Sequence, residues 1–202
     1  MTKPDLQQPP FTRRIERTTP KAEACAWLAE AMQLGGLLEN PAPPAAVRWI
    51  ETFADAYGAE LASVADALPL IAALRAEATQ VPALALERLR SRQVIFFLDA
   101  VSQYVDDQPE LRGLPLAADL REIAREFGLD SADALWAVRM AVTGREDGPP
   151  LELLFPLLGH DRIMLRIGAI SSHLLHGRGL EPIKFGPDGK PFKPIEATKP
   201  AP

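Results

Sequence analysis

The feature that most constrains the fold of this chain is a series of apolar residues spaced three or four positions apart, repeated throughout its middle. This spacing places apolar side chains on one face of an α-helix, whereas a half-buried strand needs strict alternation. No segment of the middle shows that alternation. We therefore expect an all-α protein, a bundle or cage of seven to nine helices. The patterns predict helices over 20–35, 47–58, 61–77, 82–104, 116–128, 131–144, 149–159 and 163–177.

Two of these patterns carry a further prediction. Pro69 falls inside 61–77, so the helix there must kink or be two pieces, because proline removes one backbone donor and crowds the preceding turn. The run 94–98 within 82–104 is apolar on all sides, which indicates a long central helix buried all round.

Proline divides the chain into a middle and two ends. Ten of the twenty prolines lie in 1–20 and 182–202. Residues 1–19 have no sustained periodicity and are predicted to form a flexible N-terminal arm. Residues 20–177 are predicted to form the helical domain. Residues 178–202 form a Pro-rich tail, either extended or folded as a small hairpin around Asp188-Gly189.

Charge follows the same division. Each end is mildly basic, whereas residues 22–177 carry twelve Lys and Arg against twenty-two Asp and Glu. A body this acidic repels a polyphosphate as a whole. Nucleic-acid binding must therefore depend on a local cluster of basic residues.

Several other classes of function find no support in the sequence. Its single cysteine allows no internal disulfide, and it has neither a bilayer-length apolar run nor a signal-like N-terminus, so we expect a cytoplasmic protein with no membrane partner. Phosphate-binding glycine loops and catalytic serine or zinc motifs are missing. His173 and His176 lie one helical turn apart without a third ligand and are predicted to be solvated. We predict no catalytic residue, no cofactor and no metal.

Residues 136–167 carry the most specific pattern in the chain. Twelve of their positions follow in order the pattern Arg-x-Ala-x-Thr-Gly, then Gly-Pro-x-Leu, then Leu-Leu-Gly and a last helix with an arginine before an apolar residue: Arg139, Ala141, Thr143, Gly144, Gly148, Pro149, Leu151, Leu157, Leu158, Gly159, Arg166 and Ile167. This pattern resembles the C-terminal anticodon-binding region of bacterial glutamyl-tRNA synthetases. The resemblance implies the all-helical anticodon-binding domain of these class I enzymes, with 136–176 as its helix-loop-helix part.

The resemblance also implies a role and a boundary. In the family this region helps to hold the anticodon loop, a role that would fall on the matched Arg139, Pro149 and Leu151. The family's catalytic half bears motifs like His-Ile-Gly-His and Lys-Met-Ser-Lys-Ser, and neither string occurs here. The expectation is a free-standing, non-catalytic domain.

Helix ends, backbone donors and arginines come together in this region, and such groups can hold an unstacked base and its phosphate. The candidate RNA-binding residues are Arg139, Thr143, Gly144, Arg145, Pro149, Leu151, Arg162 and Arg166. On the alternative interpretation, Thr143-Gly144 only ends a helix and the arginines pair with neighbouring acids.

Two functions follow from these alternatives. The first is binding of tRNA or another structured RNA. The second is a helical protein-interaction or regulatory module that has lost RNA binding and docks a protein partner through its tails. Convergence of the four arginines on one exposed positive patch would favour the first, whereas scattering or cover by acids would favour the second.

Overall fold

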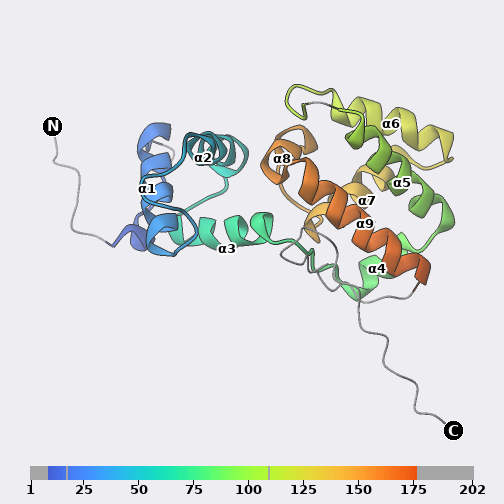
Figure 1. Ribbon diagram of the computed structural model, residues 1–202, viewed down its shortest axis with the longest axis horizontal. Helices are drawn as coiled ribbons and strands as arrows, with labels where there is room; N and C mark the ends of the chain where they lie inside the picture. Colours follow the sequence, from blue (N-terminus) through green and yellow to red (C-terminus); the bar gives the residue numbers. More distant parts are fainter. Residues whose placement is uncertain (1–8, 17, 109, 177–202) are drawn as a thin grey trace, which may run out of the picture.

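The computed structural model describes residues 9–16, 18–108 and 110–176, and these form nine α-helices after a short 3₁₀ turn at Pro10–Thr12 (Figure 1). The only strand-like pairing among them is a single bridge between Arg14 and Ser63. The prediction of an all-α fold of seven to nine helices is confirmed. The helices are α1 Lys21–Leu34, α2 Pro44–Tyr57, α3 Val64–Arg75, α4 Ala83–Leu89, α5 Arg92–Asp106, α6 Leu116–Glu126, α7 Ser131–Thr143, α8 Leu151–Leu158 and α9 His160–His176.

Helices α1 to α3 form one end of the molecule (Figure 1). On α2 the aromatic residues Trp49, Phe53 and Tyr57 follow each other at every fourth position, and therefore share one face. Their rings stack in series, with centroids 5.6 Å and 5.1 Å apart. Helix α2 packs on α8 and is therefore, with α3, one of the elements through which this end meets the rest of the fold.

The segment before α1 also belongs to this end. Residues 9–16 lie within the stretch expected to be an arm, yet the amide of Ile15 donates to the carbonyl of Ala62 and the amide of Val64 donates to the carbonyl of Arg13, both at 3.0 Å. Arg13 is buried and pairs with Glu30 of α1 at 2.6 Å. Residues 1–8 and 177–202 lie outside the described residues, as does the expected hairpin at Asp188-Gly189, so the predicted domain limits stay a prediction.

Helices α4 to α9 form the other end, with α9 packed against α5, α7 and α8 (Figure 1). Ile163, Ile167 and Ile170 of α9 are at most 1% exposed, and Leu174 is partly buried. The predicted apolar stripe of the last helix is therefore the side of α9 that packs into the core.

The prediction of one long helix over 82–104 is wrong. The segment folds as α4 and α5, and the hydroxyl of Ser91 accepts a hydrogen bond from the amide of Val94 at 3.2 Å, which caps the start of α5. Phe96 is 46% exposed, so the apolar run is not buried all round.

Of the two alternatives predicted at Pro69, a division into two pieces is wrong, because α3 continues through it; a kink there stays a prediction. Pro69 is the sixth residue of α3. The first four amides of a helix have no partner within it, but the sixth would have one, so Pro69 removes a single helical hydrogen bond.

Candidate nucleic-acid interface

The loop between α7 and α8, residues 144–150, carries the central part of the sequence pattern. Helix α7 ends at Gly144, whose φ of 70° is left-handed. The hydroxyl of Thr143 donates to the carbonyl of Arg139 at 2.7 Å and accepts from the amide of Arg145 at 3.1 Å. Thr143 thus ends the helix and sets the course of the loop.

Arg139 and Tyr57 meet beside this loop. A Cβ built on Gly148 would lie 3.3 Å from Nη1 of Arg139 and 3.9 Å from the hydroxyl of Tyr57. Nη1 of Arg139 is buried, and no hydrogen-bond partner for it exists among the described residues. Arg145 lies on the exposed part of the loop. We call Tyr57, Arg139, Arg145 and Gly148 the α7–α8 site.

Arg145 already has an acidic partner. Its guanidinium donates from Nε and Nη2 to the two carboxylate oxygens of Asp147, at 3.0 Å and 3.1 Å. Both side chains are at least half exposed. A surface pair of this kind contributes about 0–1 kcal/mol, so a phosphate can displace Asp147 at little cost.

Tyr57 is a member of the site that sequence reasoning missed. The spacing of apolar residues in α2 identifies Tyr57 as part of an apolar stripe. No pattern in the neighbouring sequence connects it to a loop about ninety positions away. Burial raises the pKa of Tyr57, whereas the nearby charges of Arg145 and Arg139 act in the opposite direction. The arginines are thus close enough to Tyr57 to influence its ionisation.

This proximity can be measured in a Tyr104→Phe background, where Tyr57 is the only tyrosine. We expect Tyr57 to ionise above the ordinary pKa of about 10 in the folded protein and at about 10 in urea. Because the folded state holds the proton more tightly, stability falls as pH rises through about 10. Replacing Arg139 and Arg145 by Gln should raise the pKa of Tyr57 further. Phenolate absorbance measures each value, and an unchanged pKa in the double variant contradicts the geometry.

Three candidate residues act through packing or backbone. Pro149 is buried and Leu151 is 4% exposed, so both side chains belong to the core. A Cβ on Gly144 would lie 2.1 Å from the carbonyl oxygen of Gln80, so the two backbones touch. These residues fix the path of the loop and do not offer side chains to a ligand.

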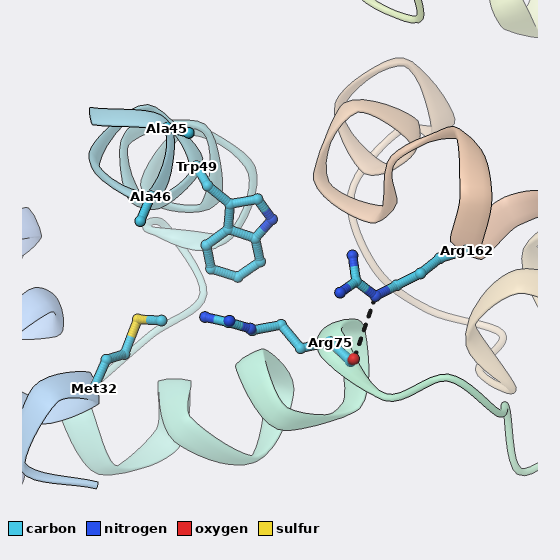
Figure 2. Close-up of a pocket in the computed structure, with 6 residues that line it drawn as sticks. All are labelled: Met32, Ala45, Ala46, Trp49, Arg75 and Arg162. Atoms are coloured by element: carbon cyan, nitrogen blue, oxygen red, sulfur yellow. Dashed lines mark hydrogen bonds between the residues drawn. The ribbon is translucent and has the colours of Figure 1, made fainter. Parts of the chain in front are cut away.

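Arg162 lies away from the loop, at a cavity of about 230 Å³ between the two ends of the molecule (Figure 2). Its Nε donates to the carbonyl of Arg75 at 3.3 Å, and its Nη1 donates to the carbonyl of Leu158 at 3.2 Å. Across the cavity, the indole nitrogen of Trp49 donates to the carbonyl of Leu157 at 2.7 Å. The cavity is lined by Met32, Ala45, Ala46, Trp49, Arg75 and Arg162.

Arg166 is 2% exposed and binds backbone carbonyls. Its Nη1 donates to Val142 at the end of α7 at 2.5 Å, and its Nη2 lies within hydrogen-bond distance of three carbonyls at the end of α3, at 2.5 to 3.1 Å. Burial, and then the charge of Arg162, lowers the pKa of Arg166 to about 10. This burial removes Arg166 from the set of residues that an RNA can touch.

The four arginines therefore do not form one exposed positive patch. Arg139 and Arg145 belong to the α7–α8 site, Arg162 lines a separate cavity and Arg166 is enclosed. The acid cover predicted by the alternative interpretation is present at Arg145, through Asp147, but Arg139 has no such cover among the described residues.

The fold and the α7–α8 site define an all-helical domain whose motif residues lie on α7, α8, α9 and the loop between α7 and α8. The chain belongs to the anticodon binding domain family, whose model matches residues 17–170. The resemblance to the anticodon-binding region of glutamyl-tRNA synthetases is confirmed.

Similar proteins agree with this family. The chain is 22% identical to glutamate–tRNA ligase 2 of Caldanaerobacter subterraneus subsp. tengcongensis over 165 residues, which are 82% of this chain and 32% of the ligase. It is 41% identical over 70 residues to glutamate–tRNA ligase of Thermobifida fusca, covering 35% of this chain and 15% of that protein. It is 29% identical over 79 residues to the ligase of Akkermansia muciniphila, covering 39% and 18%. The chain thus spans about a third or less of the length of these relatives.

The described part of the chain offers neither a metal site nor a membrane-spanning helix. No group of three His, Cys, Asp or Glu side chains there is placed to hold a metal ion. None of the helices at 21–176 combines the length and apolar composition that a membrane crossing requires.

Proposed function

We propose that this domain binds tRNA or another structured RNA through the α7–α8 site, without performing chemistry itself. The observation that carries the proposal is Nη1 of Arg139, which is buried beside Gly148 with no partner among the described residues. A buried donor without an acceptor costs about 1–3 kcal/mol. Arg139 as a whole is only half-buried, so a phosphate or a base edge that displaces the cover of Nη1 supplies the acceptor and offsets this cost.

The rest of the site is suited to the same ligand. Arg145 is exposed and its partner Asp147 is held only by a surface ion pair, so the guanidinium fork can transfer to a phosphate. Gly148 places no Cβ beside Nη1 of Arg139. Family membership adds support, since the names of the relatives identify them as tRNA ligases.

Filter binding of bulk tRNA tests this function. We expect binding that weakens steeply with added salt, because phosphate contacts release counterions. Arg139→Gln and Arg145→Gln should each weaken binding about tenfold, the effect of one charge-assisted hydrogen bond. Arg90→Gln is the matched control, since Arg90 is also exposed and pairs with a nearby acid, Glu87, at 2.9 Å.

The proposal fails if, at low salt, tRNA binds this protein no more tightly than it binds an unrelated acidic protein. It also fails if the Arg139 and Arg145 variants bind as the Arg90 variant does. Thermal unfolding of all three variants shows whether any loss of binding comes from loss of the fold.

A helical protein-interaction or regulatory module is the second candidate. It is favoured by the ten excess acids of residues 22–177 and by the cover of Arg145 by Asp147. This function predicts that removing 1–8 and 178–202 abolishes a partner found by pulldown with the full chain, while the fold persists. An unchanged partner list would count against it.

A further inference from the structure

The cavity beside Trp49 has two chemically distinct halves (Figure 2). Trp49, Met32 and two alanines of α2 form an apolar half, and the guanidinium groups of Arg75 and Arg162 form a cationic half. A shallower hollow of about 440 Å³ adjoins it and shares Ala46 and Arg75. We call the first of these spaces the Trp49 cavity.

The cationic half of the cavity has guanidinium N–H donors that no described residue accepts from. Arg75 is exposed, and the described residues offer its guanidinium no hydrogen-bond acceptor and no carboxylate partner. Figure 2 shows its side chain extending toward the space between Trp49 and Met32. Arg162 is half-buried and is oriented by the two carbonyls that bind its Nε and Nη1, which leaves Nη2 to face a ligand.

The local charge is opposite to that of the whole domain. No acidic side chain is among the residues that line the Trp49 cavity, and one, Glu39, lines the adjoining hollow. Arg166 lies one helical turn after Arg162, and the charge of Arg162 contributes to the lowered pKa of Arg166. Two guanidinium groups, of Arg75 and Arg162, thus line one cavity in an acidic body, an arrangement that favours an anion.

The apolar half of the cavity is suited to a planar aromatic ring of a ligand. The indole nitrogen of Trp49 is already bound to Leu157, so the indole is fixed and offers its apolar surface to the cavity. Ala45 and Ala46 leave the space open where longer side chains would fill it. A planar aromatic group packing on a fixed indole gains about 1–3 kcal/mol.

We propose that the Trp49 cavity binds a nucleoside phosphate, with the base against Trp49 and Met32 and the phosphate between Arg75 and Arg162. Inorganic phosphate would leave the apolar half empty, and an uncharged aromatic compound would leave both guanidinium groups unpaired. Arginine forks match phosphate oxygens in geometry and charge. The ligand is either a free mononucleotide or one nucleotide of an RNA strand, since both present the same groups.

This site is distinct from the α7–α8 site. Trp49 and Tyr57 are eight residues apart on α2, which places them about 12 Å apart along the helix axis. Binding here does not depend on the proposed function, because Arg139 and Arg145 take no part in it.

Isothermal titration calorimetry of the full chain with adenosine 5′-monophosphate, uridine 5′-monophosphate and inorganic phosphate tests the proposal. We expect Arg75→Gln to weaken nucleotide binding about tenfold and Ala46→Leu to abolish it by filling the cavity. Arg48→Gln should have no effect, since Arg48 is an exposed arginine of α2 that does not line the cavity. The double Arg139 and Arg145 variant should also bind nucleotide normally, which separates this site from the proposed function.

A second arm uses a short single-stranded oligoribonucleotide. If the oligonucleotide alone binds, with the same losses in the Arg75 and Ala46 variants, the ligand is a nucleotide of an RNA. The proposal is overturned if neither probe binds, if both variants bind as the wild type does, or if inorganic phosphate binds as tightly as the mononucleotides. Position 75 is exposed and position 46 only half-buried, and melting curves identify any variant that loses its fold.

Discussion

The Arg166→Met variant is expected to lose about 3–5 kcal/mol of its free energy of unfolding, because it removes the donors that Arg166 supplies to four buried or partly buried carbonyls. Arg166 supplies donors to Val142 of α7 and to Ala73, Leu74 and Ala76 at the end of α3. Methionine fills a similar volume, so the loss measures the hydrogen bonds and not a cavity. One side chain therefore joins the end of the first group of helices to the second.

Urea unfolding followed by circular dichroism measures this loss, with Arg162→Gln as the matched control. Arg162 lies one turn earlier on α9 and also donates to two carbonyls, but it is only half-buried, so its replacement should cost about 1 kcal/mol. Arg166→Lys should recover part of the loss, since an ammonium group keeps the charge but cannot reach both helix ends as a fork does. Equal unfolding midpoints for the Arg166→Met and Arg162→Gln variants would contradict the assigned role.

Arg166 belongs to two spacing patterns on the last helix, and they predict different environments for its side chain. Arg162 and Arg166 lie four residues apart, a spacing that places both on one side of the last helix. Arg166 is also three residues after Ile163 and four before Ile170, so it lies equally on the apolar stripe. The second pattern determines the environment of Arg166, because Ile163 and Ile170 are buried and Arg166 is buried with them. Its partners at the end of α3 lie ninety positions away, and no local pattern identifies them.

The fold class followed from the sequence because helical periodicity is a local property. The limits of the helices followed where glycine or proline marks them, as at Gly144. They did not follow between α4 and α5, where Ser91 caps a helix inside an unbroken apolar pattern. Serine occurs both at caps and inside helices, so its presence alone does not separate the two.

The candidate site was predictable only in part. The motif located the α7–α8 loop and Arg139, but Tyr57 reaches the loop through the packing of α2 on α8. The Trp49 cavity likewise combines residues from α1, α2, α3 and α9. Both sites are products of the contact between the two groups of helices, so whatever holds that contact supports both.

The segment after α3 is a second part of this contact. Thr79 is buried, and its hydroxyl donates to the carbonyl of Val142 at 3.4 Å. The next residue, Gln80, passes so close to Gly144 that a Cβ there would lie 2.1 Å from its carbonyl oxygen and 3.1 Å from Cγ2 of Thr79. The glycine of the family pattern is thus required twice, once for its left-handed backbone and once for the absence of a side chain.

Gly144→Ala is accordingly expected to destabilise the fold by about 2–4 kcal/mol, since the backbone of Gln80 must move. Gly128→Ala is the matched control, because Gly128 has a nearly identical φ of 66° with no atom within 4 Å of the added Cβ. That variant should lose only the conformational part, about 1 kcal/mol. Urea unfolding of the two variants therefore isolates the backbone contact, and equal losses would show that Gly144 is needed for its φ alone. Because Gly144 is the first residue of the α7–α8 loop, the Gly144 variant should also bind tRNA more weakly than the Gly128 variant.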